Sequence, residues 1–316
     1  MGKLRCLYCY ETLQDTIQDY HAHCCRAFFG TEIAPTLEYT NDQMLELAEK
    51  IIQSQQAVTG VQPKLSLGLQ QLDAKDKPGK LTIMGLWGTF ILKPPSEHYA
   101  DLPELEDVTM HLAEASGIPI VPHSLIRLAS GELAYLTRRI DRDDKRKFHM
   151  EDMCQVTGRM TEEKYRGSYE RVCKAIVLHS ATPALDAIRF FELLVFCFLT
   201  GNNDMHLKNF SMFRGGDGRY VFSPAYDLVP SELVVEGDDE ETALMLNGKK
   251  RKLKKKDFQQ ALLTLNLSEK VLENAFSRMG EAIPKWSSII KCSFLPEAVQ
   301  NRYIEMIERK ALQIEL

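Results

Sequence analysis

The chain has 316 residues, of which 44% are hydrophobic, 26% are charged and 9% are aromatic. These values are ordinary for a globular protein, so they exclude wholesale disorder and fibrous architectures. The formal net charge of −5 argues against nucleic acid as the main ligand, and no direct nucleic-acid binding is expected. A chain of this length is expected to form about two domains.

The sequence shows no segment that would span a membrane and no secretory signal. Its most apolar stretch, residues 190–199, has about half of the ~20 residues that a transmembrane helix needs, and Glu192 interrupts it. Residues 1–10 lack the apolar core of a signal peptide. We therefore expect a cytoplasmic protein without a membrane partner, in which reduced thiols favour metal binding or burial over disulfides.

A cysteine-rich pattern at the start of the chain predicts a small separate head, residues 1–30. It contains two pairs of metal-binding residue types, with eleven residues between the pairs and two residues within each pair: Cys6 and Cys9, then His21 and Cys24. Such pairs across a short loop can form a tetrahedral Zn²⁺ site. His23 and Cys25 are alternative ligands in the same turn, and a cluster of buried or incidental thiols is the alternative to a metal site.

Residues 31–140 are predicted to be rich in strands. A helix is expected over Asn41–Ser54 with Asn41 as its cap, and the alternation of Leu65, Leu67 and Leu69 predicts a strand. The other elements expected here are strands at 81–84 and 89–93 joined by residues 85–88, a helix at 104–115, and a hairpin of strands 125–128 and 133–138.

Residues 141–316 are predicted to be mainly helical. The helix expected at 184–200 is apolar on nearly all sides, which is typical of a buried helix. Further helices are expected at 268–279 and 296–311. A strand-rich lobe (31–140) followed by a helical lobe (141–316) indicates an α+β, two-lobed fold with a cleft between the lobes.

Two charged runs follow each other in the second half. Five acidic residues lie within 236–241, and a basic run occupies 249–256. A solvated loop and helix start is the favoured interpretation. The alternative is a docking patch for an acidic partner or nucleic acid.

The polar segment that follows the buried helix carries the strongest chemical signal. Asp204 and Asn209 are five residues apart, which is the D-x4-N spacing of the protein-kinase catalytic loop. In that loop the Asp acts as the base toward the acceptor hydroxyl and the Asn holds Mg²⁺. A lone D-x4-N is a weak signal, because chance supplies it often.

A predicted hairpin strengthens this interpretation. Strands at 210–213 and 219–223, joined by a glycine-rich turn, would bring Asp227 back beside Asn209. A carboxylate and an amide oxygen at adjacent strand ends suit a hard cation such as Mg²⁺.

A lysine at the end of a predicted strand in the first lobe completes the pattern. Lys93 ends an otherwise apolar strand and needs a partner, for which Glu106 on the next predicted helix is the natural candidate. In a nucleotide kinase such a lysine contacts the α- and β-phosphates. The loop 59–64 precedes these strands, as a loop covering the phosphates would.

These residues together resemble the HipA-like serine/threonine kinases of bacterial toxin–antitoxin systems. The general kinase signatures G-x-G-x-x-G, H-R-D and D-F-G are absent. The resemblance implies a two-lobed protein-kinase-like fold. The segments that carry it are 59–64, 90–94, 139–142, 151–155, 201–211 and 224–227, with weaker similarity at 247–249.

The resemblance implies a role for each site residue. Asp204 would be the catalytic base, Asn209 and Asp227 the Mg²⁺ ligands and Lys93 the phosphate lysine, with Glu106 as its partner. The remaining ATP-binding residues would be those of the phosphate loop, Thr59, Gly60, Val61, Gln62, Pro63 and Lys64; of the adenine hinge, Arg138, Arg139 and Ile140; and of the nucleotide and metal surroundings, His206, Leu207, Lys208 and Tyr226.

The resemblance also implies a function and partners. The activity would be transfer of the ATP γ-phosphoryl to a Ser or Thr of a protein, for which an aminoacyl-tRNA synthetase is the expected substrate. Thr59 is the hydroxyl expected to be autophosphorylated. Only about 58 residues precede the phosphate loop, so the chain resembles the short core-kinase type without the extra N-terminal subdomain. An antitoxin partner is expected, as a DNA-binding repressor or as a separate protein carrying the missing subdomain.

Two other functions are compatible with the sequence. One is a small-molecule kinase of similar fold, acting on a sugar or an antibiotic. The other is a pseudokinase that binds without catalysing, although the intact Lys93, Asp204, Asn209 and Asp227 argue against it.

Overall fold

The computed structural model describes residues 4–14, 18–54, 64–70, 78–84, 87–143, 146–215, 217–235, 237–265 and 267–316. The chain divides into two compact units. The first comprises Met1–Asp107, Val121–Arg146 and Cys292–Phe294, and the second comprises Val108–Ile120, Lys147–Lys291 and Leu295–Leu316. The expected phosphate-loop residues 59–63, and with them Thr59, lie outside the described residues.

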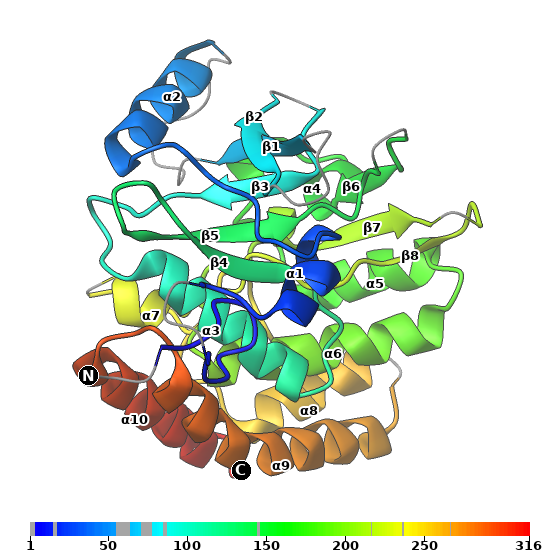
Figure 1. Cartoon of the computed structure of the whole chain (residues 1–316). Coiled ribbons are helices and arrows are strands. Elements are labelled where there is room, and N and C mark those ends of the chain that lie inside the picture. The colour runs from blue at the N-terminus through cyan, green and yellow to red at the C-terminus, as the bar shows by residue number, and fades with distance from the viewer. Residues whose placement is uncertain are drawn as a thin grey trace. The chain divides into compact units, whose positions relative to one another are not determined.

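The first unit is built on an antiparallel five-stranded sheet (Figure 1). Its order is β2-β1-β3-β5-β4, so the hairpin expected between β4 and β5 is confirmed, with Ile126 opposite Ala134. β2 and β3 are consecutive in sequence but not neighbours, because β1 pairs with both of them. The strands are β1 (Leu65–Gln70), β2 (Lys80–Ile83), β3 (Phe90–Lys93), β4 (His123–Arg127) and β5 (Leu133–Arg138).

The helices that begin in the described part of the first unit are α1 (Ala22–Phe29), α2 (Asn41–Ser54) and α3 (Leu102–Ala115). The expected helix at Asn41–Ser54 is confirmed, but its expected cap is wrong. Thr40 and Gln43 exchange hydrogen bonds between their side chains and each other's backbone N–H groups. This is a capping box, so the residue that caps the helix is Thr40, one position before the expected cap Asn41.

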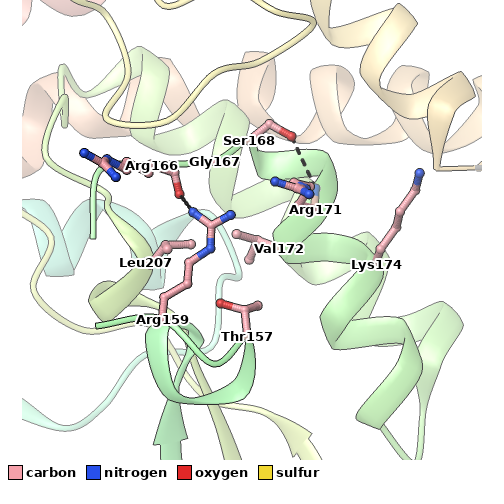
Figure 2. Close-up of a pocket in the computed structure, with 9 residues that line it drawn as sticks. All are labelled: Thr157, Arg159, Arg166, Gly167, Ser168, Arg171, Val172, Lys174 and Leu207. Atoms are coloured by element: carbon pink, nitrogen blue, oxygen red, sulfur yellow. Dashed lines mark hydrogen bonds between the residues drawn. The ribbon is translucent and has the colours of Figure 1, made fainter. Parts of the chain in front are cut away.

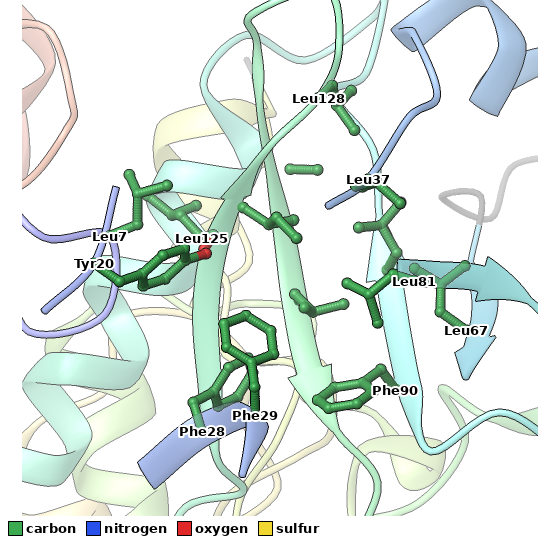
Figure 3. Close-up of a cluster of buried hydrophobic side chains, with 14 of the residues drawn as sticks. Leu7, Tyr20, Phe28, Phe29, Leu37, Leu67, Leu81, Phe90, Leu125 and Leu128 are labelled. Carbon is green, nitrogen blue, oxygen red and sulfur yellow. The ribbon is translucent and has the colours of Figure 1, made fainter. Parts of the chain in front are cut away.

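The cysteine-rich head packs into the same hydrophobic core as the sheet (Figure 3). The rings of Phe28 and Phe29 on α1 contact Phe90 of β3, with centroid distances of 5.7 and 6.1 Å. The backbone N–H of Leu125 in β4 donates to the carbonyl of Leu7, and the Tyr20 hydroxyl donates to the carbonyl of Leu125. The sheet therefore supplies much of the apolar surface that buries the head.

The second unit combines a small antiparallel sheet with a set of helices (Figure 1). The sheet order is β6-β7-β8, and the predicted hairpin β7–β8 is confirmed, with Met212 opposite Phe222. The elements are β6 (Met150–Asp152), β7 (Ser211–Arg214), β8 (Tyr220–Phe222), α4 (Met153–Val156), α5 (Tyr169–His179), α6 (Pro183–Leu199), α7 (Ser231–Val234), α8 (Lys255–Thr264), α9 (Glu269–Cys292) and α10 (Glu297–Gln313).

Helix α6 lies at the centre of the second unit's core. From Phe190 to Leu199 every residue is buried, as its apolar sequence predicts. The ring of Phe196 contacts the indole of Trp286 on α9 with a centroid distance of 5.4 Å. The end expected for α9 at residue 279 is wrong, because the helix continues through Pro284 to Cys292. Among the described residues, no helix is both long and apolar enough to cross a membrane.

Several charges of the acidic and basic runs in the second unit are paired. Lys250 pairs with Glu240, Arg251 pairs with Asp239, and the ammonium group of Lys249 pairs with the buried carboxylate of Asp257. These ion pairs leave less unbalanced charge for a docking patch than the sequence suggests, and they favour the interpretation as a solvated loop.

Candidate active site

The candidate catalytic loop begins where α6 ends. The N–H of Asn202 donates to the carbonyl of Cys197 and the N–H of Gly201 to that of Phe198, which is the Schellman pattern. Gly201 has a φ of +65°, and a Cβ there would lie 2.6 Å from the sulfur of Met306. The chain can turn out of the core at this point because position 201 carries no side chain.

Asp204 is the exposed residue of an otherwise buried loop. Asn202 and Asn203 before it and His206 after it are 2%, 7% and 7% exposed. The Tyr165 hydroxyl donates to the Asp204 Oδ1 at 2.8 Å. A carboxylate held in this way can reach a hydroxyl presented from solution, as a general base must.

The loop is fixed by hydrogen bonds in which asparagine side chains donate to backbone carbonyls. The Asn209 amide nitrogen donates to the carbonyl of Asp204 at 3.1 Å, which leaves its amide oxygen as the atom able to face a cation. Asn203 anchors the other side, because its amide nitrogen donates to the carbonyl of Glu240 at 2.6 Å and its backbone N–H to the Ser231 hydroxyl. These hydrogen bonds hold the loop on both sides of Asp204, and none of them uses the Asp204 carboxylate.

His206 is a buried ring with open hydrogen-bonding capacity. Its Nδ1 atom has no hydrogen-bond partner within the described part of the chain. Burial lowers the pKa of His206, against the opposing charges of Asp204 and Asp227. A neutral ring with an open nitrogen could bind a ligand.

Asp227 is brought back to the loop by the β7–β8 hairpin and by Tyr226. The Tyr226 hydroxyl donates to the carbonyl of Lys208 at 3.0 Å and lies 2.6 Å from the Ser211 hydroxyl oxygen. Asp227 has a φ of +58°, a sparsely populated backbone conformation for a residue with a Cβ. Strained positions of this kind cluster at functional sites, where the surrounding contacts hold them.

Two expected nucleotide-site residues of this loop are held by other contacts. Lys208 pairs with the carboxylate of Asp152 at 2.7 Å, and Asp152 also caps α4. Leu207 is buried, and its N–H donates to the carbonyl of Lys164.

The loop as a whole offers donors that suit a Mg²⁺-bound phosphate. The carboxylates and the amide oxygen are of the kind that Mg²⁺ prefers, and the ring nitrogen could contact the phosphate. These donors belong to Asp204, Asp227, Asn209 and His206.

In the first unit, Lys93 and Glu106 form the ion pair that the sequence suggests. The Lys93 ammonium lies 2.6 and 2.7 Å from the two carboxylate oxygens, and the residues are 3% and 1% exposed. The ammonium also lies 5.4 Å from the ring centroid of Tyr135. The pair fixes the position of the lysine; its role in binding phosphate stays a prediction.

The expected hinge residues lie at the end of β5 and directly after it. The N–H of Arg138 donates to the carbonyl of Pro122 and the N–H of Arg139 to that of Thr89. The Arg139 guanidinium binds both carboxylate oxygens of Asp141 at 2.8 Å. Burial acts to raise the pKa of Asp141, but Arg139 and Arg142 outweigh it and hold that pKa below its usual range. Arg138 is exposed and Ile140 is half-buried. Lys64, the residue immediately before β1, is exposed.

The head brings four metal-binding side chains together. The ligand atoms of Cys6, Cys9, His21 and Cys24 all lie within 4.8 Å of one another. The Nδ1 atom of His21 is 3.5 Å from the Cys9 sulfur and 3.8 Å from the Cys24 sulfur. Donor atoms of a tetrahedral zinc site are ~3.4–3.8 Å apart, given Zn–S and Zn–N bonds of ~2.3 and ~2.0 Å.

The chemistry of these donors also fits zinc. The Nε2 of His21 lies 3.3 Å from the carbonyl of Thr12, a contact that would place its proton on Nε2 and leave Nδ1 for the metal. Burial, with the neighbouring Cys6, raises the pKa of the Cys24 thiol, so without a cation the Cys24 sulfur stays protonated. The alternative ligand His23 lies 3.3 Å from the Cys24 sulfur, whereas burial raises the pKa of Cys25 to about 11. All eight cysteines are free of disulfides.

Sequence reasoning assigned no supporting role to the residues that hold the site. Tyr165 precedes Asp204 by 39 positions, Asp152 precedes Lys208 by 56, and Asn203 binds a carbonyl 37 residues later. The one local signal was Asp152 followed by Gln155, which is a helix-capping pattern and gives no hint of Lys208.

Comparison with known proteins identifies relatives. Residues 56–287 match the HipA-like C-terminal domain. A Sinorhizobium fredii protein named "Putative kinase Y4dM" is 33% identical over 233 residues, which cover 68% of this chain and 55% of that protein. The serine/threonine-protein kinase toxin HipA of Shewanella oneidensis is 25% identical over 201 residues, which cover 56% of this chain and 43% of the toxin. The chain thus spans about half the length of these curated relatives.

A solved structure supports the same relationship at the level of the fold. The Shewanella oneidensis toxin–antitoxin complex of HipA, HipB and operator DNA contains a chain that matches with a TM-score of 0.66 at 21% identity, covering 85% of this chain and 71% of that one. Since the family match extends over residues 56–287, well over half of the sequence, the protein belongs to the HipA-like C-terminal domain family and has a kinase-like fold.

Proposed function

We propose that this protein is an ATP-dependent serine/threonine protein kinase of the HipA-like toxin type. The observation that carries the proposal is the loop in which an exposed Asp204 stands beside buried Asn209 and His206, with Asp227 returned to it by Tyr226. This arrangement offers a base toward solution and metal-binding oxygens behind it.

Each residue has a task in the proposed reaction. Asp204 accepts the proton of the acceptor hydroxyl, whose oxygen forms a bond to the γ-phosphorus as the bond to ADP breaks. Asn209 and Asp227 would hold Mg²⁺, which neutralises phosphate charge when it is bound. Lys93, held by Glu106, would bind the α- and β-phosphates.

The test is phosphorylation of a bacterial lysate with labelled ATP. We expect label on a protein band with the wild type and none with Asp204→Ala. Label that appears on metabolites instead of protein would favour the small-molecule kinase. ATP that binds with and without Mg²⁺ but is never turned over would favour the pseudokinase.

The toxin role and its partners belong to the same proposal. The relative of known structure is complexed with HipB and operator DNA, and we propose a neutralising partner of this kind here. An aminoacyl-tRNA synthetase is the proposed substrate. Expression should then arrest growth through Asp204 and leave one type of tRNA uncharged; equal arrest with Asp204→Ala would contradict this.

We further propose that the head binds one structural Zn²⁺ through Cys6, Cys9, His21 and Cys24. The four donor atoms and the Thr12 contact of His21 support this ligand set. Protein purified without added metal should contain about one zinc per chain, and Cys9→Ser should lose it. Cys173→Ser is the matched control, because that buried cysteine lies on α5, outside the cluster. A metal-free wild type would overturn the proposal.

A further inference from the structure

A basic cavity lies beside the catalytic loop, within the second unit (Figure 2). Its volume is about 320 Å³. Four cationic side chains contribute to its wall, and none of the described residues lining it is acidic. The lining residues are Thr157, Arg159, Arg166, Gly167, Ser168, Arg171, Val172, Lys174 and Leu207.

Much of this positive charge is not balanced by carboxylates. No ion pair or side-chain hydrogen bond is found for Arg171 or Lys174 among the residues that the structure describes. Arg166 pairs with Glu163 at 3.5 Å, and Arg159 donates to the carbonyl of Arg166. Cations that line a hollow without an internal anion make it attractive to an anion from outside.

The geometry suits a phosphoryl group. In Figure 2 the guanidinium groups of Arg159 and Arg171 lie near each other below Ser168, while Lys174, on the next turn of α5, points away from them. Ser168 caps α5, so the first N–H groups of this helix add partial positive charge at the same place. Paired guanidinium groups bind the several oxygens of a phosphate in bidentate fashion, and a dianion balances more of this charge than a carboxylate does.

The cavity is joined to the catalytic base by a short piece of chain. Tyr165 donates to the Asp204 carboxylate at 2.8 Å, and its neighbour Arg166 lines the cavity. Leu207, three residues after Asp204, also lines it and donates its N–H to the carbonyl of Lys164. A group bound in the cavity therefore lies beside the segment that holds Asp204.

We propose that this cavity binds a phosphoryl group carried by the acceptor protein, so that the enzyme prefers acceptor segments that are already phosphorylated nearby. This proposal rests on the proposed kinase function, because it names the class of acceptor that the kinase would use. The binding itself depends only on the cavity.

The first test measures binding without ATP. A fluorescent serine peptide with one phosphoserine is titrated against the full chain, beside the same peptide unphosphorylated. We expect the phosphopeptide to bind at least about tenfold more tightly, and Arg171→Gln to remove about tenfold or more of that preference. Arg171→Lys should retain part of it. Lys256→Gln on α8 makes the same charge change on an exposed residue away from the cavity and should change nothing.

Three results would overturn the proposal. The peptides could bind equally, Arg171→Gln could leave the preference intact, or Lys256→Gln could reduce it as much as Arg171→Gln does. If the phosphopeptide binds only after phosphatase treatment of the protein, the ligand is a phosphate of this chain, and the assignment to the acceptor fails.

The second test measures transfer. With labelled ATP, the phosphopeptide should be a better acceptor through a lower KM, and Arg171→Gln should raise that KM while leaving kcat for the unphosphorylated peptide unchanged. A protein that binds the phosphopeptide but transfers no phosphate would refute the kinase function and leave the cavity assignment standing. Equal KM values for both peptides, with transfer intact, would refute the substrate preference alone.

Discussion

Lys93 and Asp204 are charged groups of the two units, and the structure holds them in opposite ways. Lys93 is 3% exposed and bound to both oxygens of Glu106, whereas Asp204 is exposed and held mainly through the backbone of its loop. The position of Lys93 depends on a desolvated ion pair. The position of Asp204 depends on buried neighbours in its loop. Changes at Lys93 should therefore affect folding, and changes at Asp204 should affect chemistry alone.

The largest expected effect is on catalysis at Asp204. Asp204→Asn should lower kcat by about 10²–10⁴-fold, because the acceptor hydroxyl loses its base, while the unfolding free energy and ATP affinity stay unchanged. Steady-state kinetics and urea denaturation measure the two effects. Asp227→Asn is the matched variant and should weaken Mg²⁺-dependent ATP binding as well. A stability loss at Asp204 equal to that at Lys93 would break the comparison.

The next largest effect is on the free energy of unfolding, at the buried ion pair of Lys93 and Glu106. Lys93→Met should lower the unfolding free energy by about 3–5 kcal/mol, because it leaves the Glu106 carboxylate buried without its ammonium partner. The double variant Lys93→Met/Glu106→Leu should recover most of the loss, because the buried charge is gone. Urea denaturation of the single and double variants tests this. A double variant as unstable as Lys93→Met would show that the ion pair is not the cause.

A smaller effect is expected at Gly201, which supports the Asp204 loop. Gly201→Ala should cost about 1–3 kcal/mol, because the residue has a φ of +65° and the new Cβ would meet Met306. Gly117→Ala is the control, since Gly117 has a φ of +75° and nothing lies within 4 Å of the new Cβ. Equal losses in thermal denaturation would mean that only the backbone conformation matters at Gly201.

The last effect appears only at high pH and concerns Glu104, close in sequence to Glu106 on α3. Burial raises its pKa from 4.5 to about 7. The folded state therefore binds a proton that the unfolded state has lost, and stability falls as pH rises from about 4.5 to 7. Glu104→Gln should be more stable than the wild type by about 1–3 kcal/mol at pH 8 and similar to it at pH 4. Urea denaturation at both pH values tests this, and a gain independent of pH would contradict it.

Sequence patterns predicted the elements that a short, local stretch of residues determines. The apolar run of α6 and the turn between β4 and β5 are of this kind, and so is the D-x4-N spacing of Asp204 and Asn209. The position of β1 between β2 and β3 could not be predicted in this way, because pairing between distant strands decides it. The cavity arginines were missed for a related reason: Arg159 and Arg171 meet only after the intervening chain has folded.

The attachment of the head was equally invisible in the sequence. Tyr10, which has a φ of +62°, donates its hydroxyl to the buried carboxylate of Asp107 at 2.6 Å, and His123 binds the other oxygen at 2.7 Å. A short cysteine motif predicts a local metal site, but it contains no information about a helix almost a hundred residues away.

That hydrogen bond has a consequence for synthesis on the ribosome. Tyr10 and Asp107 are 97 residues apart, so at about 5–20 residues per second the head is made some 5–20 s before its partner exists. During this interval Tyr10 has no carboxylate to bind, and Leu7 and Tyr20 lack the strand against which they pack. The proposed zinc ligands span only Cys6 to Cys24 and can close at once. Metal binding would then keep the head ordered while the nascent chain lengthens, until α3 and β4 emerge to receive it.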